Sequence, residues 1–438
     1  MEISDSSARQ TRNRNHISID IRHGDYLVAS IRGKMETISC SHSLCRVKEN
    51  IRRTNEKAYI PDKVSIGPYH HGKQGLENME EHKWRYIHAL LSRKPDLEAS
   101  LDDCLAALKE VEHKARACYE EEINVTDDEF LEMMLIDGCF IIELFLKYSI
   151  KSLRRRNDPV FTIPGMLFDL RSDLMLLENQ IPLFILQRLF EVVPTPKECT
   201  SFAKLAFHFF KYMIPGDPQI HQQKFNLEGD HILDLICHCL LPTYPGVQGT
   251  RSDQKHFRCA TELQAAGIRI KGSRTKNLLD IKFARGVLEI PHVLIHQYTE
   301  SLFRNLIALE HSSSDGVQHI TSYVFLMNSL VGSDKDVKLL QKKDILTNYD
   351  VTEKEVAKLF EKLCEGVDLN ESYYGGLFDQ VKGHKSTWTT WHLWSEELKR
   401  SYRGKPMLRM VLLVSIWALG IALVGTLFSV LTFVLHRF

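Results

Sequence analysis

The sequence has no excess of charge of either sign. Its 438 residues contain 56 Lys and Arg against 56 Asp and Glu, so the formal net charge is zero at pH 7. A protein that binds nucleic acid usually gathers positive charge on one face, often with aromatic residues between the basic ones. The sequence lacks this pattern, and we therefore expect no nucleic-acid partner.

The familiar catalytic and nucleotide-binding motifs are also missing. The sequence contains no P-loop, no glycine-rich dinucleotide motif, no serine-hydrolase elbow and no zinc-protease motif. Its ten cysteines are scattered, and several lie in apolar, helix-like runs where a reduced thiol behaves as a small hydrophobic group. Because this spread does not resemble a secreted disulfide framework, we expect a reducing compartment. We expect no cofactor and no enzymatic activity.

The two ends of the chain differ in hydrophobicity. Residues 1–37 are polar and of mixed charge, so we expect a flexible segment without a signal peptide. Residues 410–435, in contrast, run for 26 positions without a charge. Because about 20 apolar residues suffice for a helix to cross the hydrocarbon core of a bilayer, the sequence predicts one transmembrane helix at 410–435.

Basic residues precede the predicted span and indicate its orientation. They are Lys399, Arg400, Arg403, Lys405 and Arg409. Lys and Arg close to a span favour the cytoplasmic side of the membrane. We therefore expect a tail-anchored, single-pass membrane protein whose bulk is cytoplasmic. The sequence leaves open whether the membrane is the plasma membrane or an internal one.

Small residues recur at intervals of three and four inside the predicted span. They are Ser415, Ala418, Ala422, Gly425 and Ser429. Such a stripe lets two helix backbones approach closely within a membrane. Two interpretations stay open. The span associates with a copy of itself or with a partner's helix, or small residues, which are common in spans, are aligned here by chance.

The rest of the chain has mainly helical periodicity. The expected fold is mainly α, a large helical domain over residues 38–370 with a small antiparallel β element. Short runs that alternate apolar and polar residues between 268 and 294 predict this β element. An amphipathic juxtamembrane helix is expected over 371–409, either on the membrane or against the protein.

Individual helices follow from the apolar pattern. Residues 129–150 are apolar nearly all round, so we expect them at the centre of the domain. Residues 169–190 are also strongly apolar, and Pro182 predicts a kink or a break. A helix over 77–92 is expected to carry Trp84, Ile87 and Leu91 on one side. A further amphipathic helix is expected over 97–111.

The stretch VSIGPYHHG raises the question of a metal or catalytic site. Its turn consists of Gly67, Pro68, Tyr69, His70, His71 and Gly72. Adjacent side chains point in different directions, so one metal rarely binds both histidines. The nearby Cys40, His42 and Cys45 match no standard zinc spacing. We expect no metal, and we interpret the turn as a structural one that locks a helix onto the body.

Acidic residues embedded in apolar segments offer a second candidate site. They are Asp137, Glu143, Asp169, Asp173 and Glu178. Burial would raise their pKa values, as a general acid requires, and two such groups within reach of each other would suit hydrolysis. The alternative is that each accepts hydrogen bonds from nearby donors, as buried charges usually do.

Six blocks resemble the plant family called domain of unknown function 247, also named UPF0481. They are VSIGPYHHG with MEEHKWRY, MLIDGCFIIELF, DLMLLENQIPLFIL, ATELQAAGI, ITSYVFLMNSL and the terminal apolar run, in order over residues 38–438. Lys48 stands where the first block usually has a proline. The resemblance implies a single-pass plant membrane protein with a helical body, no established enzymatic activity and no catalytic residues to transfer. Some grass members are associated with pollen self-incompatibility, which implies recognition.

These features together favour a membrane-anchored recognition or signalling protein that binds another protein. Its expected working surfaces are the loops near 214–230 and 242–258, the juxtamembrane helix and the small-residue stripe. One alternative is a hydrolase that uses the buried carboxylates. Another is a structural membrane anchor.

Overall fold

The computed structural model describes eleven stretches of the chain. They are residues 43–94, 96–199, 201–225, 228–243, 257–275, 277–312, 317–349, 351–369, 371–384, 417–429 and 432. Over these residues the protein is mainly helical with small sheets, as the sequence predicted. The expected flexible segment at 1–37 lies outside the described residues.

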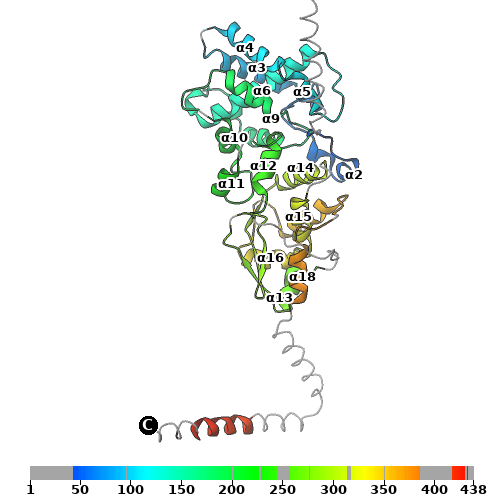
Figure 1. Ribbon diagram of the computed structural model, residues 1–438, viewed down its shortest axis with the longest axis vertical. Coiled ribbons are helices and arrows are strands. Elements are labelled where there is room, and N and C mark those ends of the chain that lie inside the picture. Colours follow the sequence, from blue (N-terminus) through cyan, green and yellow to red (C-terminus); the bar gives the residue numbers. More distant parts are fainter. Residues whose placement is uncertain are drawn as a thin grey trace, which may run out of the picture.

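The helices follow one another along an elongated body. In chain order they are α2 (Glu49–Arg52), η1 (Glu56–Tyr59), η2 (Pro68–His70), α3 (Glu77–Leu91), α4 (Leu97–Lys109), α5 (Glu112–Ala117), α6 (Asp127–Ser149), η3 (Lys151–Leu153), α7 (Pro159–Thr162), α8 (Met166–Asp173), α9 (Leu183–Val192), α10 (Phe202–Phe210), α11 (Pro218–Lys224), α12 (Ile232–Leu240), α13 (Ala260–Ala265), α14 (Thr299–Ser312), α15 (His319–Leu330), α16 (Asp334–Lys342), α17 (Glu353–Cys364) and α18 (Gly375–Gly383). Helices α3, α4 and α6 lie at one end of this body, and α13, α16 and α18 lie at the other (Figure 1).

Helix α6 is the centre of the first half, as its sequence predicted. Thr126 begins it with a capping box, in which the Thr126 side chain and Glu129 satisfy each other's backbone N–H groups. From Phe130 to Lys147 nearly every side chain is buried. Helices α3, α4, α9 and α10 pack around it, which explains why it lacks a polar face.

The predicted interruption at Pro182 is confirmed. Helix α8 ends at Asp173, and Pro182 is the N-cap of α9. The connection between them is buried over residues 174–182, although it has no regular secondary structure. Its backbone polar groups therefore need partners from elsewhere, because a buried unpaired N–H or C=O costs free energy.

The β structure exists, but the expectation of an antiparallel element is wrong in part. Strands β1 (Arg269–Gly272), β2 (Lys282–Ala284) and β3 (Val287–Ile290) form a mixed sheet in the order β1-β3-β2. In it β1 and β3 are parallel, and only β2 and β3 are antiparallel. Strand β4 (Val293–Ile295) pairs in parallel with β5 (Leu346–Asn348), after a crossover through α14, α15 and α16.

Two of the expected helices bury only part of their apolar residues. Of the three residues expected on one side of α3, Ile87 and Leu91 are buried, whereas Trp84 is 51% exposed. The neighbouring Lys83 is buried instead, because its ammonium pairs with a carboxylate in the interior. In α4, which lies within the amphipathic helix expected over 97–111, Leu97 and Leu101 are exposed.

The carboxyl-terminal expectations fall only partly on described residues. Within the part of the chain that the structure describes, no helix meets the length and hydropathy needed to cross a bilayer. Residues 417–429 of the expected span are described and helical (Figure 1). Ala418, Ala422, Gly425 and Ser429 lie on this helix, whereas Ser415 lies outside the described residues.

The expected juxtamembrane helix over 371–409 is described only at its beginning. Helix α18 occupies Gly375–Gly383, and residues 385–409 lie outside the described part. Leu377 and Val381, two of its apolar residues, are buried in the core. This first part therefore packs against the protein.

Candidate functional site

Residues 61–67, which we call the 61–67 segment, pair with no strand among the described residues, although residues 64–67 are buried. The Asp173 carboxylate accepts hydrogen bonds from the backbone N–H groups of Asp62, Lys63 and Val64, at 3.0, 2.7 and 2.9 Å. Asn179 accepts from the Ile66 N–H at 2.7 Å and donates to the Val64 carbonyl at 3.0 Å. These side chains therefore take the place of a neighbouring strand.

The same segment is fixed at its end by a buried ion pair. The Lys83 ammonium lies 2.6 Å from Oδ1 of Asp137 and donates to the Ser65 carbonyl at 2.5 Å. The other Asp137 oxygen accepts from the Gly67 N–H at 2.8 Å. Burial raises the pKa of Asp137, and the nearby Lys83 opposes this rise.

Gly67 is the position where the turn requires glycine. Its φ is +71°, a conformation that residues with a side chain rarely adopt. A Cβ atom there would lie 2.5 Å from the Gln180 carbonyl oxygen. The VSIGPYHHG turn and the ENQIP segment are thus in direct backbone contact, although more than a hundred residues separate them.

The two histidines of the turn occupy different environments. His70 is 5% exposed, whereas the next residue, His71, is exposed. Before them Tyr69 donates its hydroxyl to the Leu44 carbonyl at 2.7 Å, and its ring packs edge-on against Tyr119. The histidines therefore do not converge on one point.

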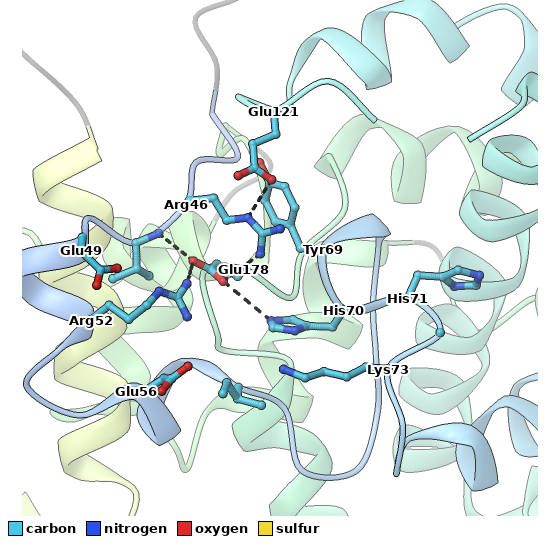
Figure 2. Close-up of a pocket in the computed structure, with 13 residues that line it drawn as sticks. Arg46, Glu49, Arg52, Glu56, Tyr69, His70, His71, Lys73, Glu121 and Glu178 are labelled. Atoms are coloured by element: carbon cyan, nitrogen blue, oxygen red, sulfur yellow. Dashed lines mark hydrogen bonds and ion pairs between the residues drawn. The ribbon is translucent and has the colours of Figure 1, made fainter. Parts of the chain in front are cut away.

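An open pocket of about 570 Å³ lies where this turn meets α2 and η1 (Figure 2). We call it the His70 pocket. Its lining residues include Arg46, Glu49, Arg52, Glu56, Tyr69, His70, His71, Lys73, Glu121 and Glu178. They come from four separate parts of the sequence, which explains why no single motif indicated the pocket.

Glu178 is the buried acid in the wall of this pocket. Its carboxylate accepts from the Val47 N–H at 2.7 Å and from Arg46 Nη1 at 3.2 Å, and it pairs with Arg52. Arg46 also donates to Glu121 at 2.9 Å. The two guanidinium groups offset the cost of burying this carboxylate.

The His70 side chain, in contrast, lacks a hydrogen-bond partner at one of its ring nitrogens within the described part of the chain. Its buried Nε2 has no hydrogen-bond partner among the described residues. The nearest carboxylate oxygen, Oε2 of Glu178, is 3.9 Å away, which is too far for a hydrogen bond. Burial, assisted by the charge of Lys73, lowers the pKa of His70 to about 4. The imidazole is therefore neutral at pH 7.

The other predicted acids are bound to donors rather than to one another. Both oxygens of Glu143 lie within 2.9 Å of Nη2 of Arg93. Burial raises the pKa of Asp173 to about 6, although its three backbone donors oppose the rise. Asp169 is half-exposed, and its carboxylate lies 4.0 Å from the Lys63 ammonium. These contacts favour the structural interpretation of the acids over hydrolysis.

The sequence did not predict a group of aromatic residues that lies on the surface. We call the rings of Phe168, His296, Tyr298 and Tyr349, together with Tyr212, which joins them through its backbone carbonyl, the aromatic cluster. The His296 ring stacks between those of Tyr298 and Tyr349, with centroids 5.2 and 5.3 Å apart. Phe168 packs edge-on against Tyr298, whose hydroxyl donates to the Tyr212 carbonyl. Because its members span residues 168–349, no local pattern reveals the cluster.

The loops expected to form working surfaces are only partly described. Within 214–230, α11 occupies Pro218–Lys224 and His221 is fully buried, so this region is not a simple exposed loop. Residues 244–256 lie outside the described residues.

Comparison with known proteins identifies the family of the chain. A family model described as "plant protein of unknown function", DUF247, matches residues 44–421. The chain belongs to this family. DUF247 membership confirms the resemblance seen in the six sequence blocks. The matched residues include the VSIGPYHHG turn, α6 and the ENQIP segment.

Relatives support the DUF247 assignment. A UPF0481 protein of Arabidopsis thaliana is 32% identical over 371 residues, which cover 78% of this chain and 77% of the relative. A putative UPF0481 protein of the same plant is 22% identical, with 86% and 85% covered. No solved structure matches the chain.

Proposed function

We propose that the protein is a membrane-anchored recognition protein, held by residues 410–435, whose helical domain binds another protein on the cytoplasmic side. The observation that carries the proposal is apolar surface left uncovered on the described terminal helix. Trp417, Leu419 and Phe428 are 73%, 66% and 70% exposed. Exposed apolar surface of this extent is typical of membrane or protein contact.

The aromatic cluster supports protein binding by the helical domain. Tyr212 is 67% exposed and Tyr349 is 54% exposed. Tyr and Trp dominate the energetics of protein interfaces, because they bury large rigid surfaces at a low entropy cost. We therefore propose the aromatic cluster as the centre of the partner-binding surface.

Proximity labelling in plant cells, with the labelling enzyme fused to the amino terminus, tests this proposal. We expect a Tyr212→Ser/Tyr349→Ser double variant to lose about tenfold or more of the enrichment of its partner, since a hot-spot residue contributes at least about 2 kcal/mol. Trp84→Ser is the matched control, because Trp84 is a comparably exposed aromatic residue on α3. Equal enrichment with the double variant and the control would contradict binding through the cluster.

A second experiment uses a chimaera to distinguish recognition by the helical domain from simple membrane anchoring. In it polyleucine replaces residues 410–435, so that the helical domain is held at a membrane without the native span. Retention of the same labelled partner supports recognition by the helical domain. Its loss supports the alternative in which the protein is a structural anchor that acts through its span.

A further inference from the structure

The His70 pocket has a buried donor without a protein partner. His70 is 5% exposed, and its Nε2 has no hydrogen-bond partner among the described residues. Buried polar atoms are almost always hydrogen-bonded, so an unpaired one that lines an open pocket suggests a ligand. Because burial keeps the imidazole neutral at pH 7, its Nε2–H tautomer can donate a hydrogen bond.

Two cations, Arg52 and Lys73, line the pocket together with this nitrogen. Figure 2 shows Arg52 on one side of the opening and His70 with Lys73 on the other. Arg52 uses one nitrogen, Nη2, for Glu178. Lys73 is exposed, and among the described residues no ion pair involves its ammonium. An anionic group placed between these three side chains would be bound by charge-assisted hydrogen bonds.

The lining of the pocket also contains negative charge. The lining holds four carboxylates, on Glu49, Glu56, Glu121 and Glu178, against three permanent cations, on Arg46, Arg52 and Lys73. Glu56 is exposed and, within the described ranges, no donor pairs with its side chain. This balance disfavours a polyanion and favours a ligand that carries both charges.

We propose that the His70 pocket binds a small zwitterionic ligand of the amino-acid and short-peptide class. Its carboxylate lies between Arg52, Nε2–H of His70 and Lys73, and its ammonium faces Glu56. The pocket volume of about 570 Å³ lies within the range of small-molecule sites, so an amino acid or a short peptide fits inside it. Binding satisfies the buried imidazole without displacing Glu178 from its arginines.

Calorimetric titration of the detergent-solubilised full chain tests this assignment. The probes are the standard amino acids and trialanine, each as the free acid and as its carboxamide. We expect saturable binding of at least one free acid, and at least tenfold weaker binding of its carboxamide, which lacks the anionic oxygen. Failure of every free acid to bind overturns the proposal, and so does equal affinity for the carboxamide.

Variants of exposed residues locate the binding without endangering the fold. Lys73→Ala is expected to weaken binding about tenfold and Lys73→Arg to preserve most of it, because Arg keeps the charge. Lys57→Ala is the matched control, since Lys57 is also exposed but does not line the pocket. Unchanged affinity in Lys73→Ala would place the ligand elsewhere and overturn the assignment. Partner labelling through the aromatic cluster is a separate readout, so the two proposals can fail independently.

Discussion

Two glycines of the turn differ in the space around them. Gly67 and Gly72 both have positive φ, at +71° and +69°. Only Gly67 is also enclosed, with the Gln180 carbonyl oxygen 2.5 Å from the position of a Cβ atom, whereas nothing lies within 4 Å of a Cβ at Gly72. The difference between the two positions is therefore steric rather than conformational.

This difference predicts the stability of two matched variants. Gly72→Ala should lower the free energy of unfolding by about 1–2 kcal/mol, the cost of the left-handed conformation alone. Gly67→Ala should cost clearly more, because its methyl group meets a backbone oxygen that cannot move freely. Thermal unfolding of the two purified variants measures the difference. Equal losses would show that the Gln180 contact is not tight.

The paired histidines allow a test of pH dependence. Burial lowers the pKa of His70 to about 4, whereas an unfolded histidine binds its proton near pH 6.5. Between these values the unfolded state binds the proton and the folded state does not. The contribution of His70 to stability is thus present above pH 6.5 and is lost as the pH falls toward 4.

We expect His70→Gln to reduce the pH dependence of unfolding between pH 6.5 and 4. One proton accounts for at most about 1.4 kcal/mol per pH unit. Part of the slope should remain, because burial also lowers the pKa of His221 to about 4. His71→Gln, at an exposed position, is the control. Denaturant titrations across this pH range provide the measurement, and identical slopes in wild type and His70→Gln would refute the assignment.

At the scale of elements, the side chains of the 173–180 segment take the place of a β-strand. Asp173 and Asn179 satisfy backbone groups of the 61–67 segment, and Gln180 binds the Leu174 and Leu176 carbonyls and the Leu233 N–H. These polar residues within an apolar sequence thus form hydrogen bonds to buried backbone that has no regular secondary structure. This explains their presence without invoking catalysis.

Two isosteric variants measure this role. Asp173→Asn should lower the free energy of unfolding by roughly 3 kcal/mol or more, because an amide NH₂ would face backbone N–H donors. Asp169→Asn is expected to cost less than about 1 kcal/mol, since Asp169 is half-exposed and its ion pair is long. The shift in unfolding midpoint reports both. A small loss for Asp173→Asn would contradict the strand-like role.

The sequence predicted elements better than contacts. The position of α6 and the break at Pro182 follow from local patterns, and both are confirmed. Helical spacing grouped Trp84 with Ile87 and Leu91, but it did not reveal that Trp84 is exposed or that Lys83 is buried with Asp137. Strand β5 was not predicted because three residues are too few to show alternation of apolar and polar side chains. Its parallel partner also lies some fifty residues earlier in the sequence.

The candidate site was predicted only in part, for the same reason. The sequence singled out His70 and Glu178, but it did not indicate that they line one pocket. Their neighbours Arg46, Arg52 and Lys73 are charged residues in polar surroundings, which have no distinguishing local pattern. The aromatic cluster likewise depends on long-range folding.

At the scale of the whole molecule, the apolar run at 410–435 predicts how the protein fractionates. A Leu419→Arg/Leu423→Arg variant should move from the carbonate-resistant membrane pellet to the soluble fraction, because each Arg costs about 2.5–3.5 kcal/mol at the centre of a span. Leu97→Arg, at an exposed position of α4, should remain in the pellet. A soluble wild-type protein would refute membrane anchoring.

The contact between the 61–67 segment and Asp173 has a consequence for synthesis. Val64 and Asp173 are 109 residues apart. At elongation rates of about 5–20 residues per second, a ribosome needs roughly 5–20 s to travel that distance. During this interval the backbone N–H groups around Val64 lack their native hydrogen-bond acceptor, and the apolar side chains nearby are not yet buried. Chaperones that protect nascent chains are expected to bind there, and to leave once the ENQIP stretch emerges from the exit tunnel.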